Sequence, residues 1–109
     1  MKKNHEFRRV YGKGVSAATG TLVLYCRKNR LDVNRLGLTV GTKVGCAVVR
    51  NRVRRRLREI YRLQRETLQT GYDLVIVARG RAADASYQAL LRDFKQLTKK
   101  LRLLREKTS

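Results

Sequence analysis

A dense run of arginines is the feature of this sequence best suited to chemistry. Between Arg50 and Arg65 the chain carries eight arginines and a single acid, Glu59. Several of these arginines are four residues apart, and each such like-charged pair costs about 0.2–0.5 kcal/mol in an isolated helix. Guanidinium groups bind phosphates through paired hydrogen bonds and stack on bases. We therefore predict a nucleic-acid-binding face in preference to a solvated one. The arginines are Arg50, Arg52, Arg54, Arg55, Arg56, Arg58, Arg62 and Arg65.

Residues that would catalyse a reaction directly are scarce. The chain has 8 acids, and no two of them are adjacent or three or four residues apart, so no carboxylate pair is predicted on one helix face. His5, the only histidine, lies beside the N-terminus and is expected to be solvated. No Ser/His/Asp order, phosphate-binding loop or glycine-rich dinucleotide motif is present. We expect any catalysis to come from a partner.

The two cysteines, Cys26 and Cys46, lack the spacing of a metal site. The N-terminal segment has two lysines with no apolar stretch behind them, so no signal peptide is visible and the cytoplasm is the expected compartment. In that reducing setting we expect small, half-buried free thiols rather than a disulfide or a metal site.

Composition narrows the class of protein. The 109 residues carry 27 Lys+Arg against 8 Asp+Glu, a net charge of +19, which calls for a polyanionic partner. With 42% hydrophobic residues the chain is too apolar for a disordered basic tail, and no run is long and apolar enough to span a membrane. The length allows one core, so we expect a single domain over residues 1–109.

The first half of the chain is expected to form a short helix and a small sheet. Asn4 is a suitable cap for a helix that ends near Gly12. Residues 20–27 and 35–41 alternate as strands do, and the polar stretch between them predicts an antiparallel hairpin. Residues 42–45 are expected to add a very short third strand.

In the second half of the chain, the spacing of the apolar residues changes from that of a strand to that of a helix. From residue 46 to residue 68 the apolar residues follow one helical stripe, which predicts a long amphipathic helix. Residues 72–79 are apolar on both alternations apart from Asp73, and they predict a central, parallel strand reached through that helix. Asp84 or Ser86 is expected to cap a last helix. Its stripe is Tyr87, Leu90, Leu91, Phe94, Leu97, Leu101 and Leu104.

The segment GLTVGTKVGCAVVRNRVRRRLREIYR resembles the signature of the bacterial ribonuclease P protein subunit, centred on Arg50, Asn51 and Arg52. The resemblance extends to Phe7 and Tyr11 before a glycine, to the strands LVLYCR and YDLVIVAR, and to the final amphipathic helix. It therefore covers nearly the whole chain. Departures from the usual family pattern occur at Gly41, Thr42 and Cys46, which puts local RNA contacts there in question.

The resemblance implies a fold and an activity. The fold is an α+β two-layer sandwich in the order α-β-β-β-α-β-α, with a small mixed sheet, three helices and a left-handed βαβ crossover, as in a domain of a ribosomal protein, although most crossovers are right-handed. The activity is that of a holoenzyme, in which a catalytic RNA removes the 5′ leader from precursor tRNA. The RNA would hold the Mg²⁺, and the protein alone would bind no cofactor, cleave nothing and need neither a membrane nor a protein partner.

The resemblance also assigns residues to the two RNA partners, ribonuclease P RNA and precursor tRNA. Core packing stays open as the alternative for Phe7 and Tyr25. The residues implied to bind the catalytic RNA are Arg50, Asn51, Arg52, Arg55 and Lys43; those implied to bind the leader are Phe7, Tyr11, Tyr25, Arg54 and Arg58.

Two other functions compete with this one. A structural basic RNA-binding protein of the ribosomal type would need phosphate contacts but no surface for a single strand. A DNA-architectural role is the third alternative. Charge alone does not separate these functions, whereas the signature around Arg50 and the aromatic residues favour the ribonuclease P assignment.

Overall fold

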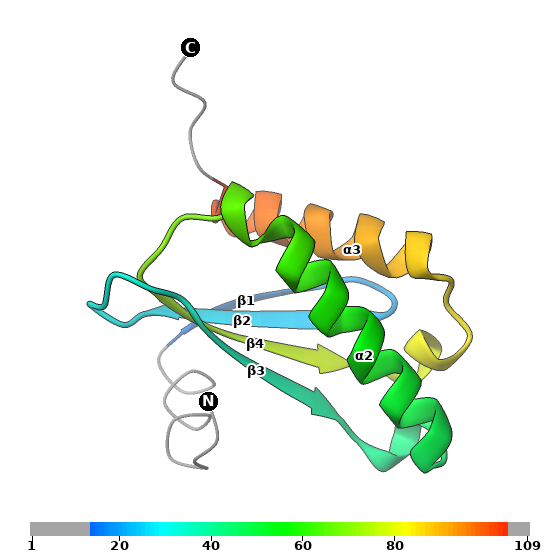
Figure 1. Cartoon of the computed structure of the whole chain (residues 1–109). Helices are drawn as coiled ribbons and strands as arrows, with labels where there is room; N and C mark the ends of the chain where they lie inside the picture. The colour runs from blue at the N-terminus through cyan, green and yellow to red at the C-terminus, as the bar shows by residue number, and fades with distance from the viewer. Residues whose placement is uncertain (1–13, 105–109) are drawn as a thin grey trace.

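The computed structural model describes residues 14–104, which form one four-stranded sheet and two α-helices (Figure 1). The predicted first helix, with Phe7 and Tyr11, lies outside the described residues. Short 3-10 turns connect several elements. The elements are β1 (Val15–Ala18), β2 (Leu22–Lys28), β3 (Arg35–Val40), η1 (Thr42–Val44), α2 (Ala47–Gln64), η2 (Arg65–Thr67), β4 (Tyr72–Ala78), η3 (Gly80–Ala83) and α3 (Tyr87–Lys100).

The strands lie in the order β1-β2-β4-β3. β2 pairs antiparallel with both β1 and β4, and β3 pairs parallel with β4. The predicted hairpin between residues 20–27 and 35–41 is therefore wrong, because β4 lies between β2 and β3. β4 is the most apolar strand, and the central position buries both of its faces.

The predicted third strand at residues 42–45 is also wrong. Thr42–Val44 is a 3-10 turn, in which Val44 N–H donates to the Gly41 carbonyl at 3.1 Å. Gly45 ends this turn with φ +147°, and a Cβ there would lie 3.2 Å from Val49 Cβ. Only glycine therefore lets the chain enter α2 at this angle. The third strand is β1 instead, whose short sequence VSAA carries no alternating pattern.

The long helix and the parallel strand that it reaches are confirmed. α2 connects β3 to its parallel neighbour β4. In Figure 1 both strands run toward the right, α2 lies on the near side of the sheet, and β4 lies above and behind β3, so the crossover is left-handed.

α2 and α3 cover the same face of the sheet and close the core against it (Figure 1). Ser86 caps α3 as predicted, since its Oγ accepts from Ala89 N–H at 3.1 Å. The predicted stripe is confirmed except at its last residue. The helix ends at Lys100, and Arg102, with φ +57°, reverses the chain so that Leu103 is buried and Leu104 is 39% exposed.

The opposite face of the sheet, which we call the far face, is lined by the alternate residues of the same strands. Tyr25 lies there, with Val75 and Gly37 as successive neighbours across β4 and β3. Val75 is completely buried although it points away from both helices. Among residues 14–104, no helix is long and apolar enough to cross a membrane.

Candidate nucleic-acid interface

The arginines of α2 are arranged around a helix whose inner side is fixed by packing. Val53, Leu57 and Ile60 are buried against the sheet. With 3.6 residues per turn, Asn51 and Arg55 lie on the side opposite these residues, and both are exposed. The exposed surface of α2 is therefore largely cationic, and its exposed large apolar side chains are Val48, 75% exposed, and Leu63, 51% exposed.

One flank of α2 is attached to the segment that leads into α3. Arg52 Nη2 donates to the Ala83 carbonyl, and Arg56 Nη1 donates to the Ala85 carbonyl, each at 3.1 Å. Both arginines are half-buried. Their positive charges thus lie at the surface while their hydrogen bonds hold the η3 segment in place, a role that the charge pattern alone does not reveal.

The other flank carries Arg50, Arg54 and Arg58 and faces the edge strand β3. Tyr61 lies on this flank and forms a hydrogen bond with Asn34, the residue before β3. Burial raises the pKa of Tyr61, and this hydrogen bond opposes the rise only in part.

Few acids offset the charge of this helix. Glu59 pairs with Arg62, with 2.6 Å between Oε1 and Nη2, and both side chains are largely exposed. Within residues 14–104 no other α2 arginine forms an ion pair. Arg54 Nη1 donates instead to Asn51 Oδ1 at 3.0 Å. The structure thus brings together two residues that the sequence analysis assigns to different RNA partners.

The start of α2 gathers further groups of the predicted site. Lys43 is exposed in η1, directly before the helix. Cys46 occupies the N-cap position and is exposed, so the expectation of a half-buried thiol is wrong there, whereas Cys26 is buried. The N–H groups of Val49 and Val48 stabilise the thiolate and lower the pKa of Cys46, with a smaller effect from the Arg50 charge. An anion at this end of α2 would meet unpaired N–H groups as well as cations.

Tyr25 lies on the far face and is half-buried. It is separated from α2 by the thickness of the sheet, so it does not lie beside Arg54 and Arg58. Strand spacing of about 4.8 Å puts Tyr25, on β2, roughly 10 Å from β3, the strand that α2 contacts on the other face. A chain that contacts both groups must cross the edge of the sheet at β3.

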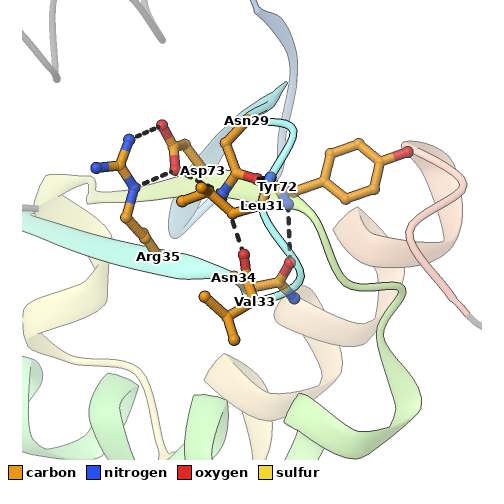
Figure 2. Close-up of polar contacts among 7 residues, drawn as sticks. All are labelled: Asn29, Leu31, Val33, Asn34, Arg35, Tyr72 and Asp73. Carbon is orange, nitrogen blue, oxygen red and sulfur yellow. Dashed lines mark hydrogen bonds and ion pairs between the residues drawn. The ribbon is translucent and has the colours of Figure 1, made fainter.

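An ion pair on the far face, between the buried Asp73 and the partly exposed Arg35, is the feature that sequence analysis missed. Asp73, 6% exposed, accepts from Arg35 Nε at 2.7 Å and Nη2 at 2.6 Å, and from Asn29 Nδ2 at 3.0 Å (Figure 2). Burial alone would raise the pKa of Asp73, but the hydrogen bonds from Arg35 and Asn29 outweigh it, and the pKa is lowered. The sequence does contain a signal for this ion pair, because Asp73 is the only acid in an otherwise apolar strand.

No group of three metal-ligating side chains occurs within residues 14–104. The described part of the chain carries exposed cations on α2 and a half-buried aromatic ring at Tyr25.

Comparison with known proteins gives consistent results. The family model for ribonuclease P matches residues 1–102. The ribonuclease P protein component of Natranaerobius thermophilus is 49% identical over 106 residues, covering 97% of this chain and 92% of that protein. A structure of the Staphylococcus aureus RNase P protein superposes with a TM-score of 0.89 at 31% identity, covering 96% of both chains. A mutant of the S. aureus protein, described as defective in mRNA degradation activity, also superposes with a TM-score of 0.89 at 31% identity, over 95% of this chain and 88% of that one.

Proposed function

Because the chain belongs to the ribonuclease P protein family, we propose that it binds a catalytic RNA through α2 and that the complex removes the 5′ leader from precursor tRNA. The observation that carries this proposal is the cationic surface of α2. Within residues 14–104, the pair between Glu59 and Arg62 is the only ion pair that involves a side chain of this helix. Phosphates of a structured RNA would supply the missing counter-charge.

The catalytic RNA would bind at the start of α2. Lys43, Asn51 and Arg55 are exposed there and available to phosphates. Arg50 and Arg52 lie beside them, half-buried, with each Nε buried and without a hydrogen-bond partner among residues 14–104. Their Nη groups would contact the RNA, and the Nη2 of Arg52 would also hold the Ala83 carbonyl.

The leader would bind on the far face. Tyr25 offers a half-buried aromatic ring on β2, in register with Val75 of β4, and base stacking on an aromatic ring is worth about 1–3 kcal/mol and tolerates any sequence. We assign Phe7 and Tyr11 to the same surface by their match to the family motif. Arg54 and Arg58 would hold leader phosphates where the strand crosses the edge of the sheet at β3.

The chemistry would belong to the RNA. The holoenzyme would hold Mg²⁺ through RNA oxygens, and the protein would position the substrate and neutralise phosphates. A cytoplasmic location, where tRNA precursors are made in bacteria, fits this role.

Reconstitution tests the proposal. The protein is added to a bacterial ribonuclease P RNA at low Mg²⁺, and leader cleavage from precursor tRNA is measured. We expect strong stimulation, with no cleavage of precursor tRNA by protein that is free of RNA. The RNA-free protein is also assayed on an mRNA, because of the activity named for the S. aureus protein. Binding without stimulation would favour a structural RNA-binding protein, and cleavage of precursor tRNA by the protein alone would contradict the assignment of catalysis to the RNA.

A further inference from the structure

A second basic surface lies at the end of the sheet away from the start of α2. Two adjoining hollows, of about 540 and 260 Å³, share Lys28, Arg30 and Tyr72, and Arg27 also lines the larger one. We call this surface the end groove. Among residues 14–104, none of those that line it is acidic.

The cations of the end groove are not neutralised by the described chain. Neither Lys28 nor Arg30 forms an ion pair within residues 14–104, and both are exposed. The nearby carboxylate of Asp73 is directed to Arg35 and Asn29 (Figure 2). An anion in the end groove would therefore meet uncompensated positive charge.

The loop that carries Arg30 is held in a fixed conformation. Asn29 N–H donates to the Gly71 carbonyl at 2.9 Å, and Asn29 Oδ1 accepts from Leu31 N–H at 2.8 Å. Arg30 has φ +62°, a left-handed conformation that glycine adopts more easily. This backbone conformation and the two hydrogen bonds of Asn29 fix the point from which the exposed Arg30 side chain leaves the loop.

Tyr72 supplies an aromatic side chain to the end groove. It pairs with Lys28 across the β2–β4 ladder, and its ring points away from the Asp73–Arg35 pair (Figure 2). Tyr72 is half-buried and packs against the hydrophobic core, and the exposed part of its side chain is flanked by cations. An exposed aromatic surface between cations suits a nucleotide, because a base stacks on the ring while Lys and Arg contact phosphates.

We propose that the end groove binds a short segment of RNA, with phosphates at Lys28 and Arg30 and a base against Tyr72. The proposal rests on the RNA-binding function proposed above. The ladder from Lys28–Tyr72 to Leu22–Ala78 spans about 20 Å, and the start of α2 lies near its other end. The end groove is therefore a binding surface separate from that of α2. The RNA segment that it binds belongs either to the catalytic RNA or to the precursor tRNA.

The test uses the double variant Lys28→Gln, Arg30→Gly in the full chain. Glycine suits the backbone at position 30, so the melting temperature should not fall. The matched control is Arg92→Gln, Lys95→Gln, which removes the same charge from the exposed surface of α3. Affinity is measured against salt in two arms, protein with the catalytic RNA and holoenzyme with precursor tRNA.

We expect one arm to lose about tenfold in affinity near 0.15 M salt, with a log–log salt slope shallower by about 1.4, since two phosphate contacts are lost. The arm that changes identifies the source of the RNA. Because the two basic surfaces are far apart, adding Arg55→Gln should lower the logarithm of affinity additively. No change in either arm, or an equal loss in the control, would overturn the proposal.

A measurement on the unchanged protein guards against misfolding of the variant. Acylation of the Lys28 amine is followed by mass spectrometry with and without RNA. Protection of Lys28 in the complex, with Lys95 still reactive, supports the end groove, and equal reactivity of Lys28 in both states contradicts it. If leader cleavage is still stimulated while Lys28 is unprotected, the end groove fails and the proposed function stands.

Discussion

Asp73 is the residue on which the geometry of the far face depends most directly. It joins β4 to β3 through Arg35 and to the 29–34 loop through Asn29. Asn34 completes the connection, because its Oδ1 accepts from Tyr72 N–H at 2.9 Å and its Nδ2 donates to the Gln69 carbonyl, also at 2.9 Å. The far face and the end groove thus share one polar framework.

We predict that Asp73→Asn lowers the free energy of unfolding at neutral pH by about 2 kcal/mol, because Arg35 loses a charged partner. The pKa of Asp73 is lowered in the folded state, so this contribution is present above the unfolded pKa near 4 and is lost as the pH falls through the folded pKa. Urea denaturation at several pH values measures it. Asp32→Asn, an exposed change in the same loop, is the control; an equal effect of both changes at pH 7 would contradict the prediction.

Cys46 reports on the start of α2. Its thiol is exposed and has a lowered pKa, whereas burial raises the pKa of Cys26. Iodoacetamide near neutral pH should therefore modify Cys46 well before Cys26, as peptide mapping will show. Catalytic RNA should protect Cys46, since we place the RNA at this end of the helix. Faster modification of Cys26, or the same rate at Cys46 with and without RNA, would be inconsistent with these assignments.

At the scale of elements, the arginines of α2 have two different roles. Some are exposed on the surface that we propose binds RNA, and others hold the segment before α3 by hydrogen bonds. Arg55 is exposed on the outer side, Arg56 donates to the Ala85 carbonyl, and Arg52 donates to the Ala83 carbonyl beside the predicted RNA surface. From the sequence, replacement of Arg50 or Arg52 is expected to weaken RNA binding without affecting the fold, because both lie off the apolar stripe. The hydrogen bond of Arg52 changes this expectation.

We predict that Arg55→Ala weakens binding to the catalytic RNA and leaves stability unchanged. Arg56→Ala should lower stability by about 1 kcal/mol with little effect on RNA binding, and Arg52→Ala should do both. Circular dichroism melts and RNA binding titrations of the three variants measure the two effects. If Arg55→Ala and Arg56→Ala have the same profile, α2 does not divide its arginines in this way.

The elements that sequence predicts well here are those with local signals. α2 is marked by the spacing of Val53, Leu57 and Ile60, and α3 by its stripe and the Ser86 cap. Strand pairing is different, because it joins segments far apart in the chain. Residues 20–27 and 35–41 are close in the sequence, which suggests a hairpin. β4 lies between these two strands instead, because the central position buries both of its apolar faces.

The predicted site shows the same division. Side-chain type identifies the cations of α2, but it does not reveal that Arg52 and Arg56 bond to carbonyls of the η3 segment and the residues after it. Nor does it reveal that Tyr25 lies on the face opposite α2, since that depends on which side of the sheet the helix packs.

At the scale of the whole molecule, the net charge of +19 should make RNA binding strongly dependent on salt. If about six phosphates are neutralised, the log–log slope of affinity against salt should lie between roughly −4 and −5. Filter binding or fluorescence anisotropy with the catalytic RNA over a range of KCl concentrations measures this slope. A slope shallower than about −2 would mean that the arginines of α2 are mainly solvated.

The two faces of the sheet give the molecule two separate tasks in our account. We propose that α2 binds the catalytic RNA on one side and that the far face receives the leader on the other. Tyr25 is the test residue for leader binding, and Arg55 is the test residue for binding of the catalytic RNA. The change Tyr25→Leu keeps the apolar volume of the side chain but removes most of its stacking surface.

The most direct test is the affinity of the Tyr25→Leu holoenzyme for precursor tRNA and for mature tRNA. We predict that precursor binding weakens by about 1–3 kcal/mol, that mature tRNA binding hardly changes, and that affinity for the catalytic RNA and the melting temperature stay as in the unchanged protein. Arg55→Ala should instead weaken assembly with the catalytic RNA. Equal losses for the two tRNAs, together with a lower melting temperature, would show that Tyr25 is a packing residue and would contradict the assignment of the leader to the far face.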